Sequence, residues 1–351
     1  MKKRVVVAMS GGVDSSLTAA LLKEQDYEII GITMQIWPDS EKSDTCCSLS
    51  AVEDARRVAS KIDIPYYVLN LKEEFKARVV DNFISEYKLG RTPNPCVRCN
   101  QYIKFEALLK KAQDLGTDFV ATGHYARIEK KDRYLIKKGL DPKKDQSYFL
   151  YPLTQTQLSK ALMPLGELTK SEVRKLAADL GLQVADKPES QEICFIDDDN
   201  YGRFLKEYIP EAVKPGPILD RQGNILGMHG GIVFYTVGQR RGLGIAHEKP
   251  LYVMSIDREK NTLIVGEWGE TFSDELIASE VNLVAIKRLE RPIKVTAKIR
   301  YNDPEAGATL YPLDENRVRL KFEKPQRAIT PGQAVVFYQD DTLVGGGTIE
   351  R

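Results

Sequence analysis

A glycine turn between an apolar stretch and a helical segment constrains this chain more than any other feature. Residues 5–9 are apolar, and residues 10–16 then read SGGVDSS. Two adjacent glycines let a backbone approach a ligand closely, and the unpaired amides at the start of a helix favour negative charge. The pattern therefore predicts a strand, a phosphate-binding turn and a helix, which together form a nucleotide site.

The same run narrows the chemistry of that nucleotide. It lacks the lysine and the spacing of a Walker A loop, so it does not predict binding of a transferred γ-phosphate. It resembles the SGGxDS pyrophosphate loop of enzymes that adenylate a substrate with ATP and release pyrophosphate. The alternative interpretation is an ordinary glycine-rich turn between a strand and a helix.

Composition sets the frame for the rest of the chain. With 351 residues, 42% of them apolar and 29% charged, the sequence predicts a soluble globular protein of two or three domains. No apolar run approaches the ~20 residues that span a bilayer, so we expect no membrane partner and a cytoplasmic location. Because the net charge is only +1, any nucleic-acid surface must be a local patch. The odd count of five cysteines indicates reactive or metal-binding thiols in a reducing compartment.

Strand and helix patterns alternate over residues 1–125. Apolar runs predict strands at 5–9, 29–34, 66–71 and 119–122, and helical spacing predicts helices at 13–23, 50–62, 75–87 and 105–115. This alternation predicts a parallel sheet covered by helices, with ligands at the carboxyl ends of the strands. The glycine turn stands at such an end.

The pattern changes after the acidic run at residues 197–199. Residues 203–208 predict one last helix, and the Pro-Gly-Pro sequence at 215–217 opens a region of short strands and turns. From residue 281 onward apolar residues alternate, at Val295, Ala297, Ile299, Tyr301, Val318, Leu320, Phe322, Ala334, Val336 and Tyr338. We therefore expect an α/β pyrophosphate-loop ATPase domain with a parallel sheet at 1–200, a small, mostly β central domain at 201–275 and an antiparallel β-barrel at 276–351.

The cysteines carry the second chemical signal. Cys96 and Cys99 form a CxxC motif in a proline-rich loop that enters a helix, where the helix start and nearby arginines favour the reactive thiolate. Cys194 lies between two apolar residues, and on its own it indicates a small buried side chain. Cys46 and Cys47 are adjacent and point in different directions, so we expect them to be structural.

Several stretches together resemble the bacterial tRNA-specific 2-thiouridylases, the MnmA family. These stretches are AMSGGVDSS at 8–16, GRTPNPCVRCN at 90–100, ATGHY at 121–125, GLDPKKDQSYFLY at 139–151, SQEICFI at 190–196, TVGQRRGLGI at 236–245 and TPGQAVVFY at 330–338. The resemblance covers essentially the whole chain. It implies that ATP adenylates the C2 oxygen of a wobble uridine, after which a protein-bound sulfur displaces AMP and leaves 2-thiouridine.

The resemblance also implies roles for individual residues. ATP, with Mg²⁺, would be held by Ser10, Gly11, Gly12, Val13, Asp14, Ser15, Ser16, Leu17 and Thr18, with Met34 and Gly123 on the adenosine side. Cys194 would carry a persulfide, and Cys99 would be the nucleophile that releases its sulfur by forming a disulfide with Cys194. The flipped target base and the tRNA would meet Asn94, Pro95, Cys96, His124, Lys144, Asp145, Gln146, Arg300, Tyr301 and Gln333.

The resemblance further implies a set of partners. The substrates would be tRNAs with a wobble uridine, those for Lys, Glu and Gln, and the central domain would contact them. The sulfur donor would be a cysteine desulfurase or a sulfur-relay protein. Arg240 and Arg241, between glycines, fit phosphate contacts or a solvated turn.

One position departs from the family pattern. Much of the family has an aspartate three residues before the nucleophile, where this chain has Cys96. Cys96, Cys99 and Cys194 together could ligate three irons of a [4Fe–4S] cluster, because soft thiolates select iron–sulfur clusters or zinc. A cluster mechanism is therefore an alternative to the persulfide. A structural zinc is a weaker one, since no second CxxC or nearby Cys and His pair completes four ligands.

Two other classes of function fit part of the sequence. A different pyrophosphate-loop synthetase explains the glycine turn, but it would not need Cys99 and Cys194, and it predicts pyrophosphate release without RNA. A metal-bearing RNA-binding module without activity explains the thiols and the barrel, but it leaves the ATP loop unused and predicts no release.

Overall fold

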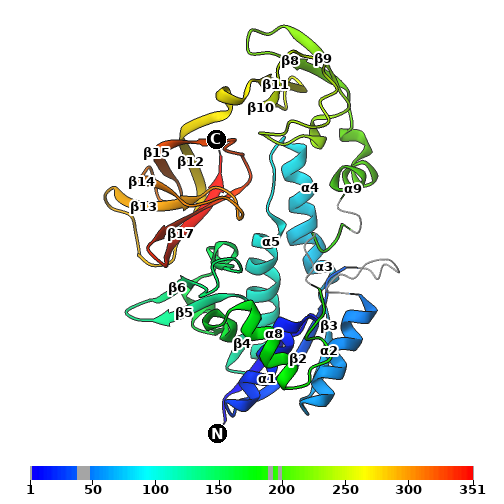
Figure 1. The fold of residues 1–351 in the computed structure, drawn as a ribbon, viewed down its shortest axis with the longest axis vertical. Helices are drawn as coiled ribbons and strands as arrows, with labels where there is room; N and C mark the ends of the chain where they lie inside the picture. Colours follow the sequence, from blue (N-terminus) through cyan, green and yellow to red (C-terminus); the bar gives the residue numbers. More distant parts are fainter. Residues whose placement is uncertain (1, 38–47, 189–192, 197–199, 351) are drawn as a thin grey trace. The chain divides into compact units, whose positions relative to one another are not determined.

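The computed structural model describes residues 2–37, 48–188, 193–196 and 200–350 (Figure 1). The chain divides into two compact units. The first comprises Met1–Val79, Cys96–Asp199 and Asp341–Leu343, and the second comprises Val80–Pro95, Asn200–Asp340 and Val344–Arg351. Within the described part of the chain, no helix has the length and hydropathy that crossing a membrane requires.

The first unit is built on a five-stranded parallel sheet with the strand order β3-β2-β1-β4-β7. The strands are β1 (Arg4–Ala8), β2 (Glu28–Gln35), β3 (Tyr66–Asn70), β4 (Phe119–Ala121) and β7 (Ala161–Leu162). The four strands that the apolar runs predict are therefore confirmed, in parallel register. The short β7 has no sequence signal, since two residues make too brief a run to show a pattern.

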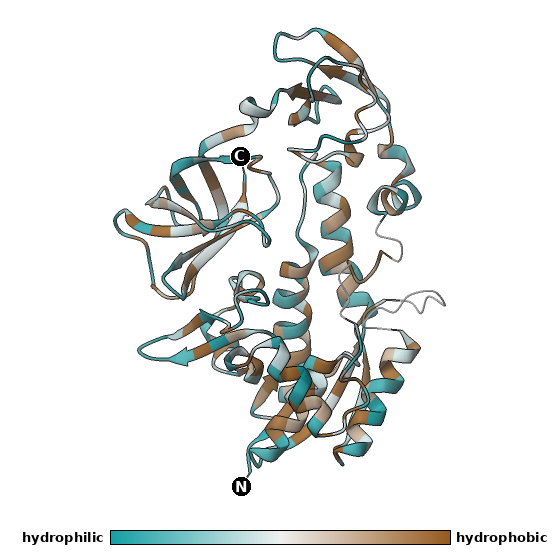
Figure 2. Cartoon of the chain, in the orientation of Figure 1, coloured by the Kyte–Doolittle hydropathy of each residue, from teal (hydrophilic) through white to brown (hydrophobic). Residues whose placement is uncertain are grey.

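Helices cover both faces of this sheet, and Figure 2 shows its strands as largely apolar. On one face, Val5 and Val7 pack in a core with residues of α1 (Val13–Glu24), α2 (Leu49–Lys61) and α8 (Lys170–Asp179). On the other face, Val6 packs with residues of β2, β4 and α6 (Leu108–Asp114). Because β1 is buried on both faces, its sequence is a continuous apolar run rather than an alternating one.

Two predicted helices are longer in the structure than in the sequence analysis. The helix expected at 75–87 runs through α3 (Lys72–Phe75), a π-helical segment η1 (Lys76–Val80) and α4 (Asp81–Lys88). The helix expected at 105–115 begins ten residues earlier, with α5 (Pro95–Arg98) and a second π-helical segment, η2 (Cys99–Ala107), before α6. Proline suits the first position of a helix, because an amide there would have no partner within the helix. Pro95 therefore starts α5, and the CxxC motif lies in the helix itself.

The first unit also contains elements that the sequence analysis did not predict. A hairpin of β5 (Ala126–Lys130) and β6 (Tyr134–Lys138) follows β4, and β6 pairs with Thr342 and Leu343. Short helical elements follow it along the chain, namely η3 (Ser147–Leu150), α7 (Gln155–Leu158) and η4 (Pro164–Glu167). The hairpin and these turns connect β4 to α8.

The second unit begins with α9 (Tyr201–Tyr208), which matches the predicted last helix. A four-stranded sheet follows in the order β10-β11-β8-β9. Its strands are β8 (Gly216–Leu219), β9 (Ile225–His229), β10 (Tyr252–Asp257) and β11 (Thr262–Gly266), with the short turns η5 (Pro210–Ala212), η6 (Ile232–Phe234) and η7 (Trp268–Thr271) around them. This is the small, mostly β domain that the turn-rich sequence predicts.

An antiparallel barrel completes the second unit. It comprises β12 (Phe272–Leu283), β13 (Ile293–Lys298), β14 (Ala306–Pro312), β15 (Val318–Arg327), β16 (Ala334–Gln339) and β17 (Thr342–Ile349), whose first two residues belong to the first unit. The long strand β12 pairs with β15 and also with β17, which closes the barrel. The predicted barrel is confirmed.

One strand of the barrel follows a different phase from the predicted one. The core of the barrel contains Val335 and Phe337 of β16, whereas the alternation in the sequence pointed to Ala334, Val336 and Tyr338. All five side chains are buried, so β16 is covered on both faces. A strand of this kind has no polar face from which its phase could be read.

Candidate functional site

The glycine turn has the geometry of a phosphate cradle. Gly11 adopts φ +71°, and a Cβ on it would lie 2.2 Å from the carbonyl oxygen of Ala51, so only glycine fits. Gly12 then caps α1 without a side-chain hydrogen bond, which leaves the first amides of the helix available to an anion. Within the turn, the Oγ of Ser15 accepts a hydrogen bond from the amide of Ser10 at 3.0 Å.

Ser16 gives a second indication of a ligand at this turn. Its side chain is fully buried, and its Oγ has no hydrogen-bond partner among the described residues. Buried hydroxyl groups are almost always paired, so an unsatisfied one beside a helix N-terminus fits a site that a polar ligand completes. The residues present therefore suit the pyrophosphate group of ATP.

The acidic residue of the turn is held by two side chains from distant parts of the chain. The hydroxyl of Tyr125 donates to Oδ1 of Asp14 at 2.7 Å, and the Nζ of Lys170 lies 2.7 and 2.8 Å from its two carboxylate oxygens. The Lys170 side chain is only 11% exposed. Sequence analysis missed Lys170, because nothing local indicates an ion pair across 156 residues.

A second lysine that the sequence analysis missed also contacts the turn. The Nζ of Lys187 lies 3.3 Å from the carbonyl oxygen of Gly11 and 2.6 Å from Oδ2 of Asp54 on α2. Two ammonium groups therefore flank the turn, one on the Asp14 side and one on the Gly11 side. Each is paired with a carboxylate, so Lys170 neutralises the negative charge of Asp14 and Lys187 that of Asp54 beside the place for a bound polyphosphate.

The residues expected on the adenosine side lie at the carboxyl ends of β2 and β4, the two strands that pair with β1. Met34 is half-buried near the end of β2, and Gly123 comes just after β4. A Cβ on Gly123 would lie 2.9 Å from the backbone of Asp14 and Ser15, so this glycine lets the chain pass directly against the start of α1. Its contact is with the turn, and its role toward adenosine stays a prediction.

The described thiols lie in different environments. Cys96 is exposed on α5, whereas Cys99 and Cys194 are half-buried. Cys194 is therefore not the fully buried apolar residue that its neighbours alone indicate. The ring of Phe195 packs at 5.7 Å from the rings of both Trp37 and Phe75, which anchors the end of the SQEICFI motif. Residues 190–192 of that motif, and both Cys46 and Cys47, lie outside the described residues.

The cluster alternative stays a prediction. Among the described residues, no three Cys, His, Asp or Glu side chains come together so that they could hold a metal ion. Cys96, Cys99 and Cys194 form no disulfide, and they are not assembled as a set of three metal ligands. We therefore derive no step through a cluster.

His124 follows β4 in a buried, polar setting. Only 7% of it is exposed, its Nδ1 lies 2.8 Å from the Oγ1 of Thr122, and its Nε2 lies 3.4 Å from the Nζ of Lys104. Burial, helped by the positive charge of Lys104, holds the pKa of His124 well below its ordinary value. The imidazole is therefore neutral at pH 7, and its expected contact with tRNA stays a prediction.

The loop expected to contact tRNA is tied together by its own side chains. Oδ1 of Asp145 accepts hydrogen bonds from the amides of Gly139 and Ser147, at 3.0 and 3.1 Å. Oε1 of Gln146 accepts a hydrogen bond from the amide of Tyr125 at 3.0 Å. Asp145 and Gln146, two of the three polar residues of this loop that are predicted to touch RNA, therefore also stabilise the loop. The third, Lys144, donates its amide to the carbonyl of Asp141 at 3.0 Å.

In the second unit, two predicted tRNA residues bind backbone carbonyls. The Nη2 of Arg300 donates to the carbonyl of Ala328 at 2.8 Å and to the hydroxyl of Thr330 at 2.6 Å. The Nε2 of Gln333 donates to the carbonyls of Thr92 and Pro93, at 2.9 and 3.1 Å. The structure therefore brings Gln333 to the segment that leads into Asn94 and Pro95, both expected at the target base. The ring of Tyr301 lies 5.5 Å from the Nζ of Lys298.

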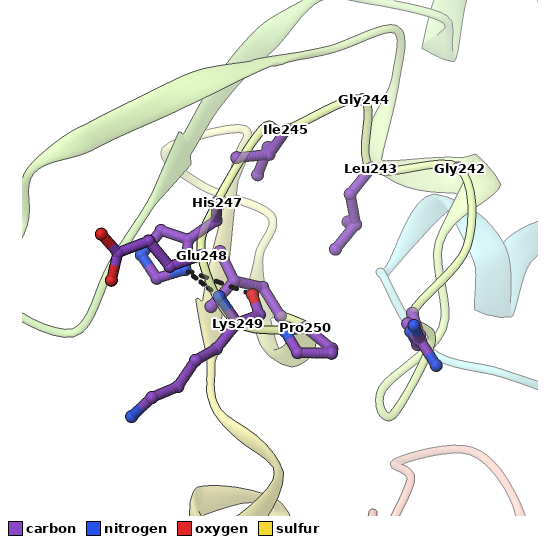
Figure 3. A pocket seen from close by; sticks show the side chains of 10 residues that line it. Gly242, Leu243, Gly244, Ile245, His247, Glu248, Lys249 and Pro250 are labelled. Atoms are coloured by element: carbon purple, nitrogen blue, oxygen red, sulfur yellow. Dashed lines mark hydrogen bonds between the residues drawn. The ribbon is translucent and has the colours of Figure 1, made fainter.

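A pocket of about 340 Å³ lies beside the TVGQRRGLGI motif of the second unit (Figure 3). Arg240, His247 and Lys249 are among its lining residues. Lys249 is held by both carboxylate oxygens of Glu267, at 2.9 Å each, and its amide lies 3.3 Å from Nδ1 of His247. Arg240 is thus placed on a concave surface, and its expected phosphate contact stays a prediction.

Three protein-family models match the chain in sequence order. Residues 3–198 match a model described as tRNA methyl transferase HUP domain, residues 202–267 a tRNA methyl transferase PRC-barrel domain, and residues 273–349 an aminomethyltransferase beta-barrel domain. These matches agree with an α/β domain followed by two β domains.

The chain is also similar to curated proteins over its whole length. A tRNA-specific 2-thiouridylase MnmA of Acetivibrio thermocellus is 55% identical, over 99% of this chain and 99% of that protein. A tRNA-specific 2-thiouridylase MnmA 1 of Thermoanaerobacter pseudethanolicus is 57% identical, and a tRNA-specific 2-thiouridylase MnmA of Halothermothrix orenii is 58% identical, each over at least 99% of both chains. As the motifs predict, this chain belongs to the tRNA-specific 2-thiouridylase MnmA family.

Proposed function

We propose that this chain is a tRNA-uridine 2-sulfurtransferase that uses ATP to convert a wobble uridine to 2-thiouridine. The observation that carries the proposal is the Gly11 cradle at the start of α1, in a chain that is related over its full length to 2-thiouridylases. Such a cradle suits the departing pyrophosphate rather than a transferred γ-phosphate.

In the first step, the C2 oxygen of the uridine attacks the α-phosphorus of ATP and pyrophosphate leaves. Residues 10–18 would hold the phosphates, while Lys170 and Lys187 neutralise the carboxylates of Asp14 and Asp54 that would otherwise repel them. Mg²⁺ would offset the charge of the pyrophosphate. No group of His, Cys, Asp and Glu in the described residues forms a metal site by itself, so we expect the ion to arrive with the nucleotide.

In the second step, the terminal sulfur of a Cys194 persulfide attacks C2 and displaces AMP. The Cys99 thiolate then attacks the Cys194 sulfur, which leaves the thiocarbonyl on the base and a Cys99–Cys194 disulfide on the protein. A thiol reductant and a new sulfur donor, a cysteine desulfurase or a sulfur-relay protein, would reset the site. The half-buried setting of both thiols supports this role, because a carrier must be reachable yet protected from bulk solvent.

The target base must leave the anticodon stack before a thiol can reach C2. Cys96 and Cys99 are three residues apart on one helical run, so they lie on the same face. With Asn94 and Pro95 just before them in the chain, they would receive the base next to the nucleophile. His124, Lys144, Asp145, Gln146, Arg300, Tyr301 and Gln333 would contact the rest of the tRNA.

The remaining expectations belong to the same proposal. The tRNAs for Lys, Glu and Gln would be the substrates, and the cytoplasm would be the location. The chain would divide functionally at residues 1–200, 201–275 and 276–351 into an adenylating, a central tRNA-binding and a barrel domain.

The test separates adenylation from sulfur transfer. With tRNA, ATP and a persulfide donor, we expect Cys194→Ser and Cys99→Ser to lose thiolation while tRNA-dependent pyrophosphate release persists. Cys47→Ser, at a cysteine that the sequence analysis expects to be structural, serves as the matched control and should retain thiolation. Full thiolation by Cys194→Ser would show that Cys194 is not the carrier, and pyrophosphate release without tRNA would favour a different pyrophosphate-loop synthetase.

A further inference from the structure

A closed ring of hydrogen bonds connects the pyrophosphate turn with the loop at residues 139–147. The first half of the ring passes through Tyr125. Its hydroxyl donates to Asp14 in the turn at 2.7 Å, and its amide donates to Oε1 of Gln146 in the loop at 3.0 Å. The amide of Gln146 in turn donates to the carbonyl of Tyr125 at 2.9 Å, so the two residues are joined twice.

The second half of the ring passes through Lys170, the first residue of α8. Its Nζ binds both carboxylate oxygens of Asp14, and its amide donates to Oδ2 of Asp141 at 3.0 Å. Oδ1 of Asp141 accepts from the amide of Lys143, also at 3.0 Å. Asp141 therefore joins the start of α8 to the same loop that Gln146 reaches from the other side, and α8 packs against α1 (Figure 1).

The ring is protected and partly charge-assisted. Tyr125 is 2% exposed, and the Lys170 side chain is 11% exposed. Hydrogen bonds to charged groups are stronger than neutral ones, and a low local dielectric strengthens them further. A displacement of the loop at one side of the ring therefore reaches Asp14 through two separate connections.

Asp14 is where such a displacement matters most for the reaction. It lies in the first turn of α1, beside the amides that must accept a polyphosphate. An unpaired carboxylate there would repel the nucleotide; Lys170 neutralises it, and the Tyr125 hydroxyl holds it in place by a hydrogen bond.

We propose that this ring couples RNA bound at the loop of Lys144 and Gln146 to the pyrophosphate turn, so that Tyr125 and Lys170 are positioning residues for adenylation. The inference rests on the proposed function, because it assigns RNA to the loop and ATP to the turn. Its consequence is that tRNA and ATP each strengthen the binding of the other, since coupling between two sites is reciprocal.

The experiment measures this coupling directly with the full chain. The affinity of a nonhydrolysable ATP analogue is measured with and without saturating tRNA, and the affinity of tRNA is measured with and without the analogue. Wild-type protein is compared with Tyr125→Phe and with Lys170→Met and Lys170→Arg. Tyr125→Phe keeps the aromatic side chain and both backbone hydrogen bonds to Gln146 but removes the hydroxyl that binds Asp14. Lys137→Met is the matched control, because Lys137 also binds two carboxylates in the first unit, those of Glu129 and Asp341.

In the wild-type protein and in Lys137→Met, we expect tRNA to tighten binding of the analogue about tenfold. In Tyr125→Phe and Lys170→Met this factor should fall toward one, the kcat of tRNA-dependent pyrophosphate release should fall, and the affinity for tRNA alone should not change. Lys170→Arg should restore part of the factor, which a loss of packing alone would not explain. Thermal unfolding identifies any variant that fails to fold. The variants that do fold then show whether the coupling between tRNA and ATP depends on the ring of hydrogen bonds.

The outcomes separate the two proposals. A coupling factor that persists unchanged in the folded variants, or that is already one in an active wild-type protein, overturns the inference and leaves the proposed function standing. A wild-type protein that makes no 2-thiouridine and releases no pyrophosphate with any wobble-uridine tRNA overturns the proposed function, and the inference with it.

Discussion

The side-chain amide of Gln333 donates a hydrogen bond to the backbone carbonyl of Thr92, 241 residues away along the chain, at 2.9 Å. A second hydrogen bond, to Pro93, extends this contact at 3.1 Å. The residue just before β16 therefore holds the segment that enters α5, where the CxxC motif begins.

Replacing Gln333 with glutamate tests this contact. Glutamate keeps the size of the side chain but has no N–H donors, and its carboxylate would face two carbonyl oxygens. We expect kcat/KM for tRNA thiolation to fall about thirtyfold, because two hydrogen bonds of ~1 kcal/mol each are lost. Gln339→Glu, a glutamine on β16 that binds the Lys294 carbonyl, is the control. Equal rates for the two variants would contradict a special role for Gln333.

Replacing Gly11 with alanine tests the cradle. The left-handed backbone and the approach to Ala51 leave no room for a Cβ, so we expect a loss of at least ~2 kcal/mol in unfolding free energy and a large rise in the KM for ATP. Gly12→Ala is the stability control, because its nearest contact would be Ser10 Oγ at an ordinary 3.6 Å. Chemical unfolding curves of both variants check the prediction, and similar losses from the two would refute it.

We expect the buried imidazole of His124 to make the unfolding free energy depend on pH. Because burial lowers its pKa in the folded protein, the unfolded chain binds the proton more readily, at an ordinary pKa of 6.5. The stability from neutral His124 is therefore complete above pH 6.5 and decreases below it, by up to ~1.4 kcal/mol per pH unit. Urea unfolding between pH 5.5 and 7.5 should show this slope, and His124→Asn should flatten it. The same change at the exposed His247 should leave the slope in place.

Replacing Cys96 with aspartate distinguishes the two routes of sulfur. Cys96 is exposed, and under the persulfide proposal an aspartate there should keep thiolation within about threefold. Under a cluster mechanism the change removes one of three ligands and should abolish activity. Thiolation by iron-free protein with a persulfide donor is the measurement, with iron and acid-labile sulfide content determined on protein purified without oxygen. Loss of activity in Cys96→Asp, together with stoichiometric iron in the active protein, would refute the persulfide route.

Local sequence patterns predicted most of the fold and the glycine turn of the candidate site. The parallel sheet follows from four buried apolar runs, and the turn at Gly11 follows from adjacent glycines between a strand and a helix. These signals are readable because the residues that generate them are neighbours in the chain. Where a strand is buried on both faces, as β16 is, or is as short as β7, no local contrast exists and the prediction fails.

By itself, the sequence determined the family and the position of the glycine turn, since both depend on residue types at short spacing. Only the tertiary structure decided which distant side chains complete the site. Lys170 reaches Asp14 across 156 residues, and Gln333 reaches Thr92 across 241. Such contacts depend on how the strands and helices pack, and no local pattern encodes the distance between two side chains that only packing brings together.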